Sequence, residues 1–95
     1  MVTGKIVTVG SGFPGNLLAQ GGINGSRVIV RPDRQGGIST RIDGREFDDL
    51  NQGAPVQPGQ TVAFSLEAGE ELYAYQDGDI CSVWVLIGGV NPEDL

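Results

Sequence analysis

The sequence predicts an all-β fold, built as a small antiparallel β-sandwich or a jelly-roll-like barrel. Two observations lead to this prediction: the chain has 16 glycines and 5 prolines among 95 residues, and its apolar residues fall in short runs that mostly alternate with polar ones. Glycine and proline at this density join many short elements through tight turns, and alternation with a period of two is typical of a half-buried strand. A chain of this length buries one modest core, so we expect residues 1–95 to form a single domain.

Seven short runs have the composition of strands. They are residues 5–9, 27–31, 38–42, 45–47, 61–66, 71–76 and 80–87. The run at 45–47 is included because Asp43-Gly44, directly after the third run, is a two-residue hairpin signal. We expect residues 48–59 to be a loop, and residues 10–26 to be a long glycine-rich loop with at most one helical turn. A loop of that length is unusual in a compact domain unless it binds something or lies against a neighbour.

The last predicted strand, ICSVWVLI, is apolar on both faces. Its odd-numbered residues are expected to face the core, which leaves Ile80, Trp84 and Leu86 on the outside. Pairing with residues 71–76 across an Asp-Gly-Asp turn would bring Tyr73 and Tyr75 to the same outer face. Monomers seldom expose such a patch, and tryptophan and tyrosine are typical interface anchors. We therefore expect an interface here; the alternatives are that the loop at residues 10–26 of the same chain covers the patch, or that the strand is buried on both sides.

Three arginines, Arg27, Arg31 and Arg41, project from strand faces opposite the apolar residues. If their two strands pair, the three side chains converge on a basic cluster that could bind phosphate, an acidic glycan or the carboxylates of a protein partner; a solvated face is the alternative. Residues 1–45 carry all six basic residues and two acids, a net charge of +4, whereas residues 46–95 carry ten acids and no base, a net charge of −10. This asymmetry is compatible with head-to-tail contacts between copies or with a basic face that docks on an acidic partner; the alternative is that folding interleaves the two halves and spreads the charge.

The composition gives little support for catalysis or for a bound cofactor. The chain contains no histidine, the commonest general base at neutral pH, and its single cysteine, Cys81, is predicted as a small buried residue on a strand. Gly10, Gly12 and Gly15 have the spacing of a dinucleotide-binding loop, but the segment after them is too short for the helix that such a site requires. The acids on turns lack the further spaced ligands of a calcium site. We expect no enzyme activity, no catalytic residue, no cofactor and no metal.

Membranes and nucleic acids are also not expected as partners. No apolar run approaches the roughly 20 residues needed to cross a bilayer, and MVTGKIVTVG at the N-terminus lacks the pattern of a signal peptide. The net charge of −6 and the absence of aromatic residues among the arginines disfavour nucleic acid. We therefore expect a protein that is made in the cytoplasm and keeps its thiol reduced.

Residues 58–89 contain PGQTVAFSLEAGEELYAY and then ICSVWVLIGG, an alternating strand, a glycine turn before a Leu-Tyr-Ala strand, and a valine-rich final strand. This segment, about a third of the chain, resembles the closing strands of small β-sandwich modules on the virions of tailed bacteriophages. The resemblance implies a capsid decoration (cement) protein or a fibre or tail module, commonly trimeric and without enzyme activity. Such a protein would be made in the host cytoplasm, reside in the virion, and bind itself and the major capsid protein or another virion protein.

In this setting, Tyr73, Tyr75, Trp84 and Leu86 would be apolar anchors, and Arg27, Arg31 and Arg41 would set the orientation of the partner. The alternative function is a carbohydrate-binding or fibre-type adhesion module, in which exposed tyrosine and tryptophan side chains stack on sugar rings.

Overall fold

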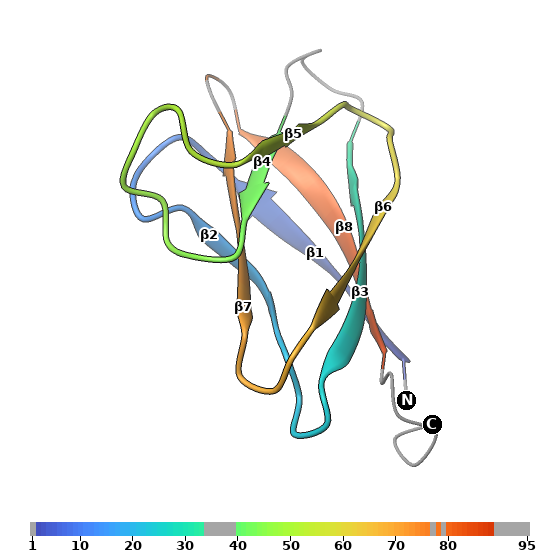
Figure 1. Cartoon of the computed structure of the whole chain (residues 1–95). Helices are drawn as coiled ribbons and strands as arrows, with labels where there is room; N and C mark the ends of the chain where they lie inside the picture. Colours follow the sequence, from blue (N-terminus) through green and yellow to red (C-terminus); the bar gives the residue numbers. More distant parts are fainter. Residues whose placement is uncertain (1, 34–39, 77, 79, 89–95) are drawn as a thin grey trace.

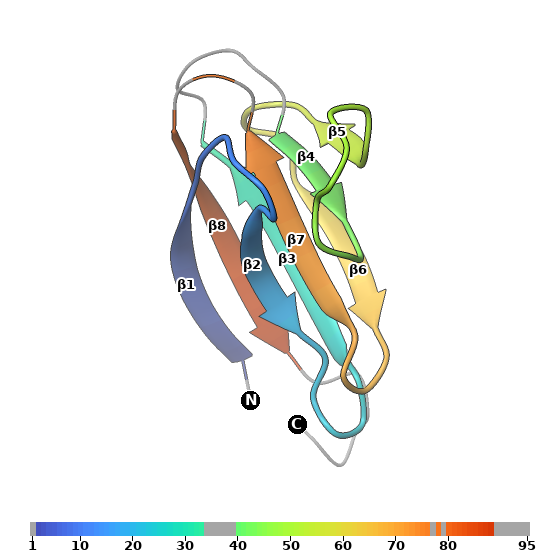
Figure 2. The same cartoon turned by 90° about the vertical axis from the view of Figure 1, so that its left-hand side faces the viewer.

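The computed structural model describes residues 2–33, 40–76, 78 and 80–88, and it confirms the all-β fold. In this part of the chain, eight strands form two antiparallel four-stranded sheets (Figure 1). The strands are β1 (Val2–Val9), β2 (Asn16–Gln20), β3 (Ser26–Pro32), β4 (Thr40–Asp43), β5 (Ala54–Val56), β6 (Val62–Leu66), β7 (Glu71–Gln76) and β8 (Cys81–Gly88). Sheet A has the order β1-β8-β3-β6 and sheet B the order β2-β7-β4-β5. Figure 2 looks onto sheet B, with sheet A behind it.

Alternation along the strands places one apolar row of each sheet in the space between the sheets. The inward rows predicted for residues 61–66 and 80–87 are confirmed, since Leu66, Val83 and Val85 are buried and Val62 and Phe64 pack against them. Most of the core residues are β-branched or otherwise aliphatic, which suits pleated strands. The buried core consists of Val9, Leu18, Ala19, Val28, Val30, Ile42, Val56, Leu66, Leu72, Ala74, Cys81, Val83 and Val85.

One polar pair is enclosed within the sandwich. Thr40 on β4 and Gln76 on β7 are both almost fully buried, and the Thr40 hydroxyl donates a hydrogen bond of 2.8 Å to Oε1 of Gln76. The Sγ atom of Cys81 lies 3.6 Å from the same hydroxyl. Because buried polar atoms are costly without partners, this contact allows Thr40 and Gln76 to lie inside the sandwich.

The predicted pairing of residues 71–76 with residues 80–87 is wrong. Strand β7 lies in sheet B between β2 and β4, whereas β8 lies in sheet A between β1 and β3. The pairs run from Val2↔Gly88 to Val9↔Cys81 on one side of β8, and from Arg27↔Gly88 to Pro32↔Val83 on the other. Alternation in a sequence identifies the inward face of a strand, but it does not identify the strand's neighbours. Residues 77 and 79 of the Asp-Gly-Asp turn lie outside the described residues.

The segment 10–26, predicted as one long loop, contains strand β2. This edge strand pairs with β7, and its register shifts between Leu17 and Ala19, so that two consecutive residues, Leu18 and Ala19, are both buried. The shift interrupts the alternation of inward and outward side chains, and the sequence pattern of a strand is therefore missing.

The strand predicted at residues 45–47 is also wrong. After β4 the chain forms an irregular connection, residues 44–53, which we call the 44–53 loop, and β4 pairs with β5 instead. Strand β5 is the outermost strand of sheet B, a position that tolerates Pro55 because an edge strand leaves one row of amide positions unpaired. In the predicted strand 38–42, residues 40–42 belong to β4, and residues 38 and 39 lie outside the described residues.

Candidate functional site

The outer face of sheet A carries a row of exposed apolar side chains. Trp84 is paired with Ile6 on β1 and with Arg31 on β3, and Leu86 is paired with Ile29 on β3. Paired residues of antiparallel strands project to the same side of a sheet, so these side chains are neighbours. The exposed fractions are 57% for Ile6, 48% for Trp84 and 43% for Leu86. We call Ile6, Ile29, Trp84 and Leu86 the sheet A patch.

A groove of about 620 Å³ runs over this patch. Gly4 is paired with Leu86, and because it lacks a side chain it leaves the floor of the groove open beside the leucine. A Cβ atom at this position would lie 3.5 Å from Cδ1 of Leu86, which is an ordinary contact distance. A small side chain would therefore fit beside the leucine, and glycine leaves that space open. The groove is lined by Gly4, Lys5, Ile6, Ile29, Arg31, Thr61, Trp84, Val85 and Leu86.

The charge on sheet A has one sign. Its four strands contain Lys5, Arg27 and Arg31 but no aspartate or glutamate. The guanidinium carbon of Arg31 lies 5.8 Å from the centre of the Trp84 ring, within the range of a cation–π interaction. Arg27 is exposed on the same face of β3, on the other side of Ile29 from Arg31. The groove is therefore apolar along its floor and positively charged at its edge.

Trp84, Leu86, Arg27 and Arg31, four of the seven predicted interface residues, share this outer face. Ile6, Ile29 and Gly4, which complete the groove, were missed by the sequence reasoning because it did not pair β8 with β1 and β3. The alternation of KIVTV and RVIVR places Ile6 and Ile29 on the outer face, and only the strand order brings them beside Trp84 and Leu86.

Tyr75 and Arg41 lie elsewhere, on the outer face of sheet B, where the chain covers them itself. The Tyr75 ring is only 6% exposed. It stacks on Phe13 at 5.6 Å and on Phe47 at 5.5 Å between ring centres. The guanidinium carbon of Arg41 lies 4.7 Å from the centre of the Tyr75 ring. The expected convergence of Arg41 with Arg27 and Arg31 is therefore wrong, and so is the joint patch of Tyr75 with Trp84.

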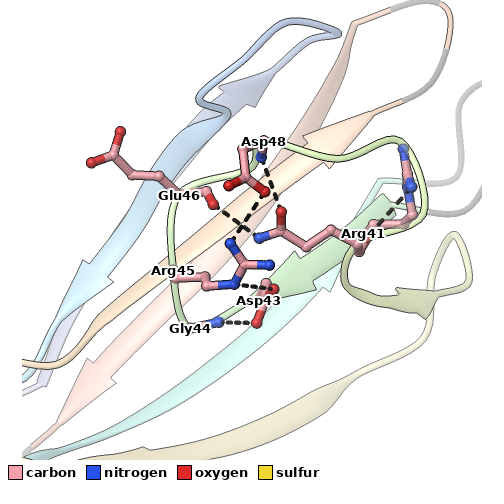
Figure 3. Close-up of polar contacts among 7 residues, drawn as sticks. Arg41, Asp43, Gly44, Arg45, Glu46 and Asp48 are labelled. Carbon is pink, nitrogen blue, oxygen red and sulfur yellow. Dashed lines mark hydrogen bonds and ion pairs between the residues drawn. The ribbon is translucent and has the colours of Figure 1, made fainter.

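The 44–53 loop is fastened to sheet B by a dense set of contacts (Figure 3). Nη1 of Arg41 donates hydrogen bonds to the carbonyl oxygens of Leu50 and, at 3.3 Å, of Gln52. The buried Gln52 side chain donates to the carbonyl of Glu46 and accepts from the amide of Asp48, both at 2.9 Å. Phe47, almost fully buried, donates its amide to the carbonyl of Pro14 at 2.7 Å. The loop therefore has a defined conformation.

Glycines make room for the Phe47 ring. Gly15 and Gly53 have positive φ angles of 92° and 90°, a region in which residues with a side chain are strained. A Cβ atom at either position would also come within 3.0 Å of the Phe47 ring. The buried aromatic residue and the two glycines therefore form one unit.

Tyr73 is half-buried on the outer face of sheet B and is not part of the sheet A patch. Its hydroxyl donates a hydrogen bond of 3.2 Å to Oε2 of Glu71. Partial desolvation raises the pKa of the Tyr73 phenol, and the negative charges of Glu71 and Glu46 raise it further. The raised pKa favours the protonated phenol, which is the form that donates the hydrogen bond to Glu71.

Comparisons with known proteins find no match: no protein-family model, no curated protein and no solved structure is similar to this chain. Among the described residues, no helix is long and apolar enough to span a membrane. The same residues include no group of three or more cysteine, aspartate or glutamate side chains arranged to bind a metal ion.

Proposed function

We propose that this protein is a non-enzymatic structural protein that acts by assembly, using the sheet A patch to bind further copies of itself and a larger shell. Because residues 58–89 resemble phage virion modules, we propose that the shell is a phage capsid. The protein would then be a capsid decoration protein that binds the major capsid protein. In this proposal the oligomer is a trimer and the protein resides in the virion.

The observation that carries the proposal is the exposure of Trp84, Leu86 and Ile6 side by side on one sheet face. Single exposed apolar residues are common on monomers, but a contiguous apolar face around a tryptophan is typical of an interaction surface. Burial of such a face releases about 25 cal/mol for each Å² of apolar surface removed from water. Tryptophan and arginine, which lie together here, are also the residues most enriched at interface hot spots.

Arg27 and Arg31 supply orientation in this proposal. Each is exposed at the edge of the apolar row, and the strands of sheet A provide no carboxylate to neutralise them. A partner with acidic residues around an apolar centre would fit this face, whereas a basic partner would be repelled. Arg41 and Tyr75 are not part of the proposed interface, because their contacts are within the chain.

The proposal is tested by the mass of the protein in solution. We expect wild type to reach three times the 10.0 kDa of the single chain at high concentration, and Trp84→Ala to shift toward the single chain. Loss of a central interface tryptophan typically costs about 2 kcal/mol or more, which corresponds to an association roughly 30-fold weaker. Ile23→Ala is the matched control, since Ile23 is highly exposed in the turn between β2 and β3, away from the groove. Equal masses for wild type and Trp84→Ala would show that the sheet A patch is not part of the interface.

A carbohydrate-binding module is the second candidate, favoured by the half-exposed Trp84 ring beside Arg31 at an open groove. Aromatic side chains of this kind stack on sugar rings. Binding of wild type to a glycan array, abolished by Trp84→Ala in a protein that stays a single chain at all concentrations, would favour this candidate over assembly.

A further inference from the structure

We infer that the groove on sheet A binds the tip of the 44–53 loop of a second copy, with the partner copy's Leu50 side chain in the groove and its Asp49 carboxylate near Arg31. This inference rests on the proposed self-association and identifies the surface that the sheet A patch meets. The two surfaces lie on opposite faces of one molecule, so the contact must join different copies.

The position of the loop follows from its contacts. Phe47 stacks on Tyr75, and Arg41 binds the carbonyl of Leu50, and both Tyr75 and Arg41 point outward from sheet B. The loop therefore lies on the far side of sheet B from sheet A, and the groove lies on the outer face of sheet A. Both sheets stand between the groove and the Leu50 of the same chain.

Leu50 is 65% exposed although the loop around it is fixed. The Leu50 carbonyl is held by Arg41, the amide of Gln52 donates to the carbonyl of Asp49 at 3.2 Å, and the amide of Asn51 donates to the Asp49 side chain at 2.8 Å. A leucine presented on a fixed turn loses little conformational entropy when it binds, which favours association. The contacts that hold the loop on sheet B therefore also keep Leu50 in position for binding.

The charges of the two surfaces are complementary. The groove edge carries Arg31 and none of the residues that line the groove is acidic, whereas Leu50 directly follows two exposed acids, Asp48 and Asp49. Asp48 is already paired with Arg45 at 3.2 Å. The Asp49 carboxylate accepts a hydrogen bond from the amide of Asn51 but forms no ion pair within the described part of the chain. An apolar side chain flanked by a carboxylate matches a groove that is apolar in the middle and basic at its edge.

Contact between two different surfaces has a consequence for symmetry. A groove that binds a loop is a heterologous, head-to-tail contact, and such contacts close into rings or continue as chains. A three-membered ring is one closed form, in agreement with the proposed trimer. Two sheet A faces packed on one another would instead give a two-fold dimer.

The test mixes two variants that are each defective in one surface. Trp84→Ala damages the groove and keeps the loop, whereas Leu50→Ser damages the loop tip and keeps the groove. We expect each variant alone to associate at least about tenfold more weakly than wild type, and an equimolar mixture to form a one-to-one heterodimer through the intact groove of one and the intact loop of the other. Ile23→Ser, a polar substitution at another exposed turn, is the matched control and should assemble as wild type does. Circular dichroism of each variant verifies that the fold is retained.

The outcomes separate this inference from the proposed function. If Trp84→Ala dissociates the assembly while Leu50→Ser leaves it intact, or if the mixture gives no heterodimer, the loop is not the partner surface and the sheet A patch still serves assembly. If wild type remains a single chain at every concentration, both self-association and the loop contact are overturned.

Discussion

Trp84 and Tyr75 are both aromatic residues at outward positions of apolar strands, yet their surroundings are opposite. Tyr75 is enclosed between Phe13, Phe47 and the guanidinium of Arg41. The Trp84 ring has the guanidinium of Arg31 at 5.8 Å from its centre and remains about half exposed. The difference arises because the 44–53 loop crosses the outer face of sheet B, whereas no described segment crosses the outer face of sheet A at Trp84. Only Trp84 is therefore available to a partner.

Phe47→Ala tests the role of the enclosed aromatic cluster. Phe47 is almost fully buried between the loop and Tyr75, and the truncation of a buried phenylalanine typically lowers the free energy of unfolding by about 3–5 kcal/mol. We expect a loss of about 3 kcal/mol in urea unfolding, since the cluster lies outside the main core. Phe13→Ala is the control, because Phe13 contacts the other side of the Tyr75 ring but is half exposed, and it should cost less than half as much. Equal losses for the two variants would show that the loop is not anchored by Phe47.

At the scale of elements, the turn after β2 is locked to the turn between β6 and β7. The amide of Gly21 donates to the carbonyl of Glu70 at 2.7 Å, and the amide of Gly69 donates to the carbonyl of Gly21 at 3.1 Å. These bonds join the end of sheet B's edge strand β2 to the connection between the two sheets. The backbone approach is so close that there is no space for a side chain at Gly21.

Gly21→Ala should therefore destabilise the fold. A Cβ atom at Gly21 would clash with the carbonyl group of Glu67, a backbone group that cannot rotate away. Overpacking of this kind costs about 1–3 kcal/mol, and we expect a value near the upper end in urea unfolding. Gly22→Ala provides the comparison, since its Cβ would meet Ser26 Oγ at 3.4 Å, an ordinary contact. If the two variants were equally stable, the close approach of the two turns would be absent in solution.

The elements also show how far the sequence is informative. Strands β3, β6, β7 and β8 follow from short apolar runs bounded by turn residues, and the inward rows predicted for them match the core. Strands β2 and β5 could not be predicted in this way. Strand β2 contains a register shift, and strand β5 is three residues long with a central proline. The neighbours of each strand depend on contacts between distant segments, which a local pattern does not contain. For the same reason Trp84 and Leu86 could be predicted to face outward, but the prediction that they share a face with Tyr73 and Tyr75 is wrong, because the tyrosines lie in the other sheet.

The whole molecule has two unlike faces. Sheet A presents apolar side chains with Arg27 and Arg31, and its strands contain no acid, whereas the loop over sheet B presents Asp48 and Asp49. The interleaving of strands thus keeps part of the charge separation seen along the sequence. A molecule with this arrangement is suited to bind head to tail, and its association should weaken as salt screens the charges.

The central claim is that another molecule covers the outer face of sheet A, and quenching of tryptophan fluorescence tests it most directly. Trp84 is the single tryptophan of the chain, so all tryptophan emission reports on the patch. As protein concentration rises and the mass in solution increases, we expect the emission to shift to shorter wavelength and acrylamide quenching to fall to less than half of its value in the dilute single chain. If the mass increases while quenching stays at its dilute value, the molecules assemble through another surface and the claim is contradicted.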